Sequence, residues 1–94
     1  MIMVAGKLNV SPETRDEYLA GCRDVMIAAR HAPGCLDFHL SADSLESGRI
    51  NVFEAWETVA AAEAFRGTGP SAEQQTQLLS AEVYQHEIAS SVRL

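Results

Sequence analysis

The stretch Arg49–Glu57, with the sequence RINVFEAWE, decides the fold of this 94-residue chain. It is rich in β-branched and aromatic residues and carries the only Trp of the chain, which predicts a β-strand. Successive side chains of a strand point to opposite faces, and both alternating sets here contain apolar residues. One set is Ile50, Val52, Glu54 and Trp56, and the other is Asn51, Phe53, Ala55 and Glu57. We therefore expect a central strand that is covered on both faces.

Length, composition and charge limit the classes of protein to consider. A chain of 94 residues with 47% hydrophobic residues suits one globular domain over residues 1–94. No apolar run approaches the roughly 20 residues of a membrane helix, and the N-terminal MIMVAGKLNV lacks the basic start of a secretory signal. Thirteen acidic residues against seven basic ones give a net charge of −6, the wrong sign for a phosphate backbone. We expect a cytoplasmic protein that binds neither nucleic acid nor a membrane.

The two cysteines, Cys22 and Cys35, form no CxxC motif and no Cys/His pair at zinc spacing. We interpret them as buried thiols that serve as small hydrophobic side chains, because a disulfide would need an oxidising compartment. The sequence predicts no metal site.

The first part of the chain predicts a strand followed by a long helix. Residues Ile2–Val10 alternate as a strand, with Gly6 leaving a gap that suits a neighbouring aromatic group or backbone, or alternatively a ligand. Ser11 and Pro12 are favourable residues at a helix start, and the helix should run to about His31. Its expected apolar stripe is Tyr18, Leu19, Cys22, Val25, Met26 and Ala29.

The second part predicts a hairpin, two helices and a last strand. Leu36–Ser41 alternates with Leu36, Phe38 and Leu40 on one face, and the polar loop over 42–48 makes this strand an antiparallel neighbour of Arg49–Glu57. Thr58 can cap a helix that ends at Gly67 and whose Val59, Ala62 and Phe65 share a face. A short helix should follow over 71–79, and a strand over 83–92.

The resulting order, β-α-β-β-α-α-β, is the α+β ferredoxin-like arrangement, in which helices cover one face of an antiparallel sheet. The other face would stay open. Because small domains rarely expose a large apolar sheet face, we expect this face to meet its copy in a homodimer.

Three segments resemble one known family. These are MVAGKLNV at residues 3–10, APGCLDFHLS at 32–41, and NVFEAWET at 51–58 before an Ala-rich helix. They resemble the antibiotic biosynthesis monooxygenase domain, a family of dimeric α+β barrels. The resemblance implies a monooxygenase without cofactor or metal, which oxidises a small electron-rich aromatic substrate, of the quinol or polyketide anthrone type, with dioxygen. The protein would supply a dry cavity, hydrogen bonds that orient a phenol, and a proton acceptor.

The resemblance also points to residues around the Trp. It implies that Trp56 lines the cavity, with a core Trp as the alternative, and that Asn51 contacts substrate. The odd spacing of five residues places Asn51 and Trp56 on opposite faces of a regular strand, however. Glu54 shares the face of Trp56 and could accept the phenolic proton, or pair with a basic residue instead.

Four more residues are candidates for the site. Tyr84 and His86 share a face of the last strand and could bind the phenol and handle its proton, with ordinary packing as the alternative. Phe65 and His39 are candidates for substrate binding, although His39 stands among polar residues and would also suit a surface or a subunit interface.

Other functions remain open at this level. Haem degradation, found in the same family, would need an iron-binding His in the stretch after the Trp, and residues 58–79 contain none. A non-catalytic dimeric module that binds a small hydrophobic ligand, and an isomerase or lyase of the wider superfamily, are the alternatives to a monooxygenase.

Overall fold

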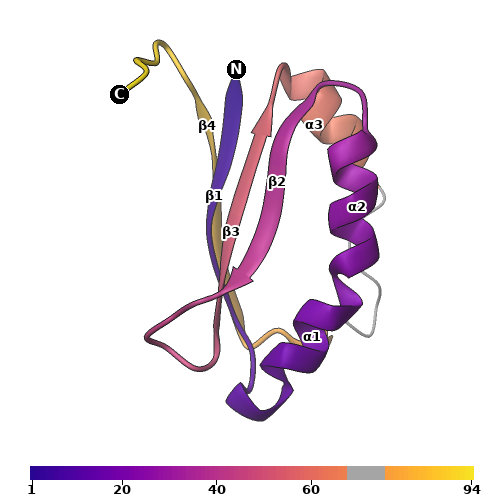
Figure 1. The fold of residues 1–94 in the computed structure, drawn as a ribbon, viewed down its shortest axis with the longest axis vertical. Coiled ribbons are helices and arrows are strands. Elements are labelled where there is room, and N and C mark those ends of the chain that lie inside the picture. The colour runs from indigo at the N-terminus through magenta and orange to yellow at the C-terminus, as the bar shows by residue number, and fades with distance from the viewer. Residues whose placement is uncertain (68–75) are drawn as a thin grey trace.

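The computed structural model describes residues 1–67 and 76–94, whose strands form one antiparallel sheet in the order β2-β3-β1-β4 (Figure 1). The strands are β1 Ile2–Asn9, β2 Cys35–Ala42, β3 Arg49–Trp56 and β4 Ser80–Glu87. The helices are α1 Arg15–Gly21, α2 Arg23–His31 and α3 Val59–Arg66, and a 3-10 turn over Pro12–Thr14 precedes α1. This confirms the expected ferredoxin-like α+β fold.

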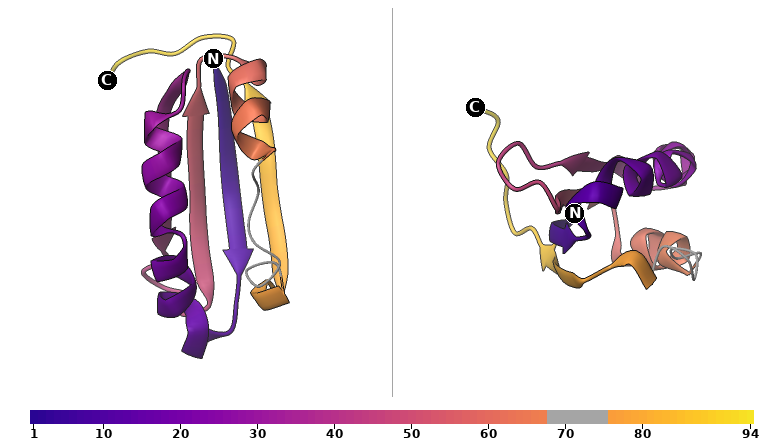
Figure 2. Two further views of the ribbon diagram at one scale, coloured as in Figure 1. Left: turned by 90° about the vertical axis from the view of Figure 1, so that its right-hand side faces the viewer. Right: turned by 90° about the horizontal axis from the view of Figure 1, so that it is seen from below.

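Strand β3 lies inside the sheet, as its composition predicts. It pairs with β1 from Ile2 opposite Trp56 to Asn9 opposite Arg49, and with β2 on its other edge. The helices lie on one side of the sheet and leave its other face free (Figures 1 and 2). Strand β3 therefore has a helix-covered face and an open face.

The core forms on the helix-covered face. Ile50 and Trp56 of β3 are fully buried, and Ala29 of α2 and Ala62 of α3 pack on the sheet in the cluster that contains Trp56. The expected stripe of α1 and α2 is confirmed, since Tyr18, Cys22 and Ala29 are buried and the others pack against them. Thr58 caps α3 as predicted, because its Oγ1 accepts a hydrogen bond from the Ala61 N–H at 3.1 Å.

The predicted helix from Ser11 to His31 is interrupted. At Cys22 the backbone N–H donates to Leu19 O, three residues back, beside Gly21, a residue with low helix propensity. This interruption divides the segment into α1 and α2. The predicted capping role of Ser11 is also wrong, because its hydroxyl donates to the Glu13 carboxylate instead of accepting from a backbone amide.

Leu36 departs from the predicted alternation. It is 51% exposed, whereas Phe38 is buried. Cys35 and Asp37 of β2 face the consecutive residues Trp56 and Ala55 of β3, so Leu36 is the extra residue of a bulge. The bulge resets the alternation and turns Leu36 away from the core.

The last strand is shifted relative to its prediction, and it occupies Ser80–Glu87 instead of 83–92. Strand β4 pairs with β1 from Ile2 opposite Glu87 to Asn9 opposite Ser80, and the Ile88 N–H donates to Met1 O. Of the short helix expected over 71–79, residues 71–75 lie outside the described residues, and 76–77 are helical.

Gly6 serves close packing of the backbone, which is one of the alternatives that the sequence leaves open. A Cβ atom at Gly6 would lie 2.0 Å from Glu82 O and 2.7 Å from the Cα of Val83. The absence of a side chain at Gly6 therefore lets the backbone of β4 approach β1 closely.

Candidate functional site

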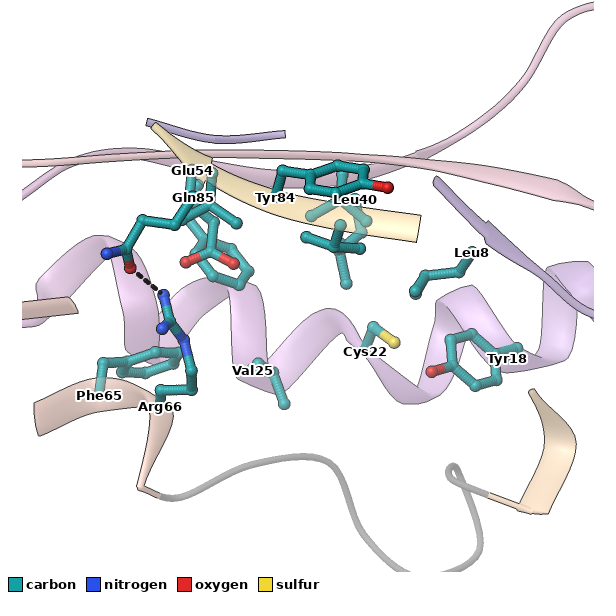
Figure 3. Close-up of a pocket in the computed structure, with 14 residues that line it drawn as sticks. Leu8, Tyr18, Cys22, Val25, Leu40, Glu54, Phe65, Arg66, Tyr84 and Gln85 are labelled. Carbon is teal, nitrogen blue, oxygen red and sulfur yellow. Dashed lines mark hydrogen bonds between the residues drawn. The ribbon is translucent and has the colours of Figure 1, made fainter. Parts of the chain in front are cut away.

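A cavity of about 420 Å³ lies between the helix-covered face of the sheet and the helices (Figure 3). Its volume is in the range of about 300–1,000 Å³ that is typical of small-molecule sites. The described residues that line it are Val4, Leu8, Tyr18, Cys22, Val25, Phe38, Leu40, Val52, Glu54, Phe65, Arg66, Val83, Tyr84 and Gln85. Most of these side chains are apolar, so the walls suit a hydrophobic ligand.

Polar groups gather at one end of the cavity, where Glu54, Arg66 and Gln85 come from β3, α3 and β4 (Figure 3). Glu54 and Gln85 both pair with Val4 of β1, so their side chains lie in one row across the sheet. Arg66 Nη2 donates to Gln85 Oε1 at 3.1 Å. No local sequence pattern indicates Arg66 or Gln85, because only the pairing of β4 with β1 brings them beside Glu54.

Trp56 holds the carboxylate of Glu54. Its indole Nε1–H donates to Glu54 Oε1 at 2.9 Å, two residues along the same face of β3. The indole is 0% exposed and packs on Phe65, with 5.5 Å between the ring centroids. Trp56 is not among the lining residues given above, so within the described structure it lies behind the wall formed by Phe65 and Glu54.

Tyr18 and Cys22 mark the other end of the cavity. Tyr18 is only 4% exposed, and its hydroxyl points toward the cavity (Figure 3). Burial raises the pKa of Tyr18, because a phenolate would lose hydration there. Tyr18 is thus a neutral hydroxyl that can donate a hydrogen bond to a ligand. The sequence pattern places both residues on the buried stripe, and periodicity alone does not separate core residues from cavity-lining ones.

Strand β4 contributes two of the predicted site residues, with different placements. Tyr84 borders the cavity, but it pairs with Ala5 in a row of the open face and is 64% exposed. His86 is exposed and pairs with Met3, and it is not among the described lining residues. Tyr84 therefore lies at the edge of the cavity with its side chain on the open face, and His86 does not reach the cavity that holds Glu54.

Asn51 and His39 lie on the open face of the sheet. For Asn51, the odd spacing from Trp56 on the same strand indicates this face, and His39 pairs with Phe53 of the same face. The Asn51 side chain accepts from Arg49 Nε at 2.7 Å and donates to Asp43 Oδ1 at 2.9 Å. That bond from Asn51, with backbone N–H donors in the same loop, lowers the pKa of Asp43 to about 2. His39 stacks on Phe53, with 5.2 Å between ring centroids. Neither Asn51 nor His39 is among the described residues that line the cavity.

Cys22 and Cys35 form no disulfide, and Cys35 is half-buried where the sequence predicted it to be buried. Burial raises the pKa of Cys35, which keeps the thiol protonated. Within residues 1–67 and 76–94, no group of three or more His, Cys, Asp or Glu side chains is placed to hold a metal ion. No helix in these same ranges is both long enough and apolar enough to cross a membrane.

The fold and the cavity define a small ferredoxin-like α+β domain with a ligand-sized chamber between its sheet and its helices. The family model for antibiotic biosynthesis monooxygenase matches residues 1–77, and the chain belongs to this family. Relatives with known sequence include an uncharacterized protein from Synechocystis sp., which is 32% identical over 60 residues. That match covers 64% of this chain and 41% of the relative, so the chain corresponds to about two fifths of the relative's length.

Solved structures show the same fold. A crystal structure described as an antibiotic biosynthesis monooxygenase has a TM-score of 0.83 at 21% identity, covering 96% of this chain and 100% of that one. A protein from Pseudomonas aeruginosa has a TM-score of 0.82 at 19% identity and covers 95% and 94%. A conserved protein of unknown function from Bacteroides thetaiotaomicron has a TM-score of 0.79 at 14% identity and covers 93% and 96%. At these identities the likeness concerns the fold alone.

Proposed function

We propose that this protein is a cofactor-independent monooxygenase that oxidises a small electron-rich aromatic compound, of the quinol or anthrone type, with dioxygen. The observation that carries the proposal is the Glu54 carboxylate, held by Trp56 at the polar end of an otherwise apolar cavity. Membership of the antibiotic biosynthesis monooxygenase family supports the same reaction class.

In the proposed reaction, Glu54 acts as the general base. Its Oε1 is occupied by the Trp56 N–H, and Oε2 has no hydrogen-bond partner among the described residues, so Oε2 can accept the phenolic proton. The anchored carboxylate keeps one orientation, which removes part of the ordering cost of the proton transfer. At the far end, the Tyr18 hydroxyl can donate to a second oxygen of the substrate.

The remaining steps need only the substrate and dioxygen. For an anthrone, the anion formed by deprotonation gives one electron to dioxygen, and the resulting carbon radical and superoxide combine into a carbon–oxygen bond. The proton held by Glu54 returns to the peroxide, and the resulting hydroperoxide eliminates water, which is formed from its outer OH and the remaining hydrogen on the same ring carbon, and leaves a carbonyl. One oxygen atom enters the product, the other leaves as water, and Glu54 is again a carboxylate.

The test is oxygen uptake with a panel of hydroquinones and anthrones in metal-free buffer, with product masses measured in parallel. The proposal expects uptake above the autoxidation rate of the buffer and, for an anthrone, a quinone product that carries one added oxygen atom and has lost two hydrogen atoms. A product of unchanged mass would point to an isomerase, and no uptake across the panel would contradict the proposal.

The second candidate is a non-catalytic module that binds a small hydrophobic ligand in the same cavity. It is favoured by the apolar walls, since Glu54 is the only carboxylate among the described lining residues. A panel member that raises the melting temperature but is not turned over would favour this candidate over the enzyme.

The proposal includes a homodimer formed through the open face of the sheet. One row across this face is His39, Phe53, Ala5 and Tyr84, which pair in turn across β2, β3, β1 and β4. The half-buried Phe53 and the exposed Tyr84 present apolar rings on this row, and a second copy would remove them from water.

A further inference from the structure

We infer that the cavity selects aromatic substrates with a carboxylate group, and that Arg66 is the residue that binds this carboxylate. The inference rests on the proposed function, because it concerns the substrate of the same cavity. It goes further by assigning a charge to that substrate and a specificity-determining role to a residue of α3.

Arg66 is placed where it could contact a ligand in the cavity. It is the only cationic side chain among the described residues that line the cavity, and it lies at the end that also holds Glu54 (Figure 3). Arg66 is exposed, and a guanidinium beside an apolar chamber is a favourable site for an anion, since Arg offers a planar fork of N–H donors that matches a carboxylate.

The hydrogen-bond partner of Arg66 is a neutral side chain. Gln85 holds the guanidinium through a neutral amide oxygen, which fixes its position without neutralising it. Among the described residues, no carboxylate lies within 4.0 Å of Arg66, and Glu54 is instead bonded to Trp56. The two ionised groups at this end are thus held by neutral partners, which leaves both available to a ligand.

The negative charge of the whole protein makes a local cation important for binding an anion. A net charge of −6 repels an anionic substrate at long range, so binding such a substrate requires a local cation at the site. Arg66 supplies that cation beside the proposed general base. It would also stabilise the phenolate that forms when Glu54 takes the proton, because the new negative charge arises near the guanidinium.

A binding experiment that needs no turnover tests this inference. Anthraquinone-2-carboxylate and its neutral carboxamide have nearly the same shape and differ in charge, and their binding can be followed through the fluorescence of the only Trp. We expect the wild-type protein to bind the carboxylate about tenfold more tightly than the carboxamide. Arg66→Gln should abolish this preference, and Arg66→Lys should keep part of it, because Lys retains the charge but not the fork.

Arg23→Gln is the matched control, since Arg23 is exposed on α2, does not line the cavity, and gives the same change in net charge. Equal affinities of the two ligands in the wild-type protein, absence of binding, or equal losses in the Arg66 and Arg23 variants would overturn the inference. If no substrate is oxidised and the preference persists, the monooxygenase proposal fails while this inference stands. Oxidation of neutral quinols without any preference for the carboxylate would support the monooxygenase proposal and overturn this inference.

Discussion

The indole of Trp56 donates a hydrogen bond of 2.9 Å to the carboxylate of Glu54 from a position that is itself fully buried. Trp56 is not among the described residues that line the cavity, so we propose that it orients the candidate base and does not itself contact a ligand. Glu54 and Trp56 share one face of β3, and we expect them to affect the kinetics differently: Glu54 by accepting the proton, and Trp56 only by positioning Glu54.

Glu54→Gln should lower kcat at least about 100-fold, because removing a general base typically costs a factor of 10² to 10⁴. The fold should be kept, since the Gln side-chain oxygen can still accept the bond from Trp56. The measurement is oxygen uptake at saturating substrate, with circular dichroism as the check on folding. Glu57→Gln is the control, because Glu57 is exposed and does not line the cavity. Equal rates in the two variants would contradict the role of Glu54.

Trp56→Phe should lower kcat about tenfold with little change in KM, because the substitution frees the Glu54 carboxylate without removing a ligand contact. The lost volume and hydrogen bond should lower the free energy of unfolding by about 1–3 kcal/mol, measurable in urea. Ile50→Val makes a comparable small loss in a buried residue that is not among the described residues lining the cavity, and it should leave kcat unchanged. A large rise in KM for Trp56→Phe would show that the indole contacts substrate after all.

Gly6→Ala should destabilise the protein by about 2 kcal/mol or more, because the new Cβ would meet backbone atoms of β4, the nearest at 2.0 Å. Gly67→Ala is the matched substitution at the end of α3, where the nearest atom is 3.7 Å away and the backbone is right-handed helical. That variant should be neutral or slightly stabilising. Urea unfolding of both variants tests this, and equal stabilities would contradict the close crossing of β1 and β4.

Asp43 should contribute to stability in acid. Its pKa is lowered from 3.8 to about 2 in the folded chain, so the folded state favours the ionised carboxylate. The stabilisation is fully present above pH 4 and is lost as the pH falls from 4 to 2. Urea midpoints across this range should show the wild type losing its advantage over Asp43→Asn. Asp24→Asn, a change at an exposed residue of α2, should follow the wild-type curve in parallel.

Phe53→Glu should abolish the proposed homodimer, because it places a charge at the centre of the apolar row on the open face. Light scattering coupled to size-exclusion chromatography measures the result, with Ser41→Glu, in a different row of the same face, as a milder control. A wild-type protein that is monomeric at all concentrations would contradict the proposed dimer directly.

Local patterns in the sequence were sufficient to predict most of the fold. The composition of Arg49–Glu57 predicted the inner strand, and the alternation of its side chains placed Asn51 and Trp56 on opposite faces, as the structure shows. The Thr58 cap was also recognisable, since a Thr hydroxyl at a helix start needs only the neighbouring amide. The bulge at Leu36 was not, because it arises from the pairing of β2 with β3.

The candidate site was only partly visible in the sequence. Glu54 and Phe65 could be named from their faces on a strand and a helix, whereas Arg66 and Gln85 had no local signal. They meet because α3 ends over the sheet where β4 pairs with β1, and the two residues are 19 positions apart. Trp56 was also singled out from the sequence, but its burial behind Phe65 depends on how α3 packs on the sheet.

The sequence by itself determined the elements and the faces of this protein, because hydrophobic periodicity and capping act between residues that are near in the chain. The tertiary structure alone decided which side chains enclose the cavity and which lie behind its wall. The physical reason is that enclosure depends on pairing and packing between segments far apart in the chain, as when Arg66 of α3 bonds to Gln85 of β4 beside Glu54 of β3.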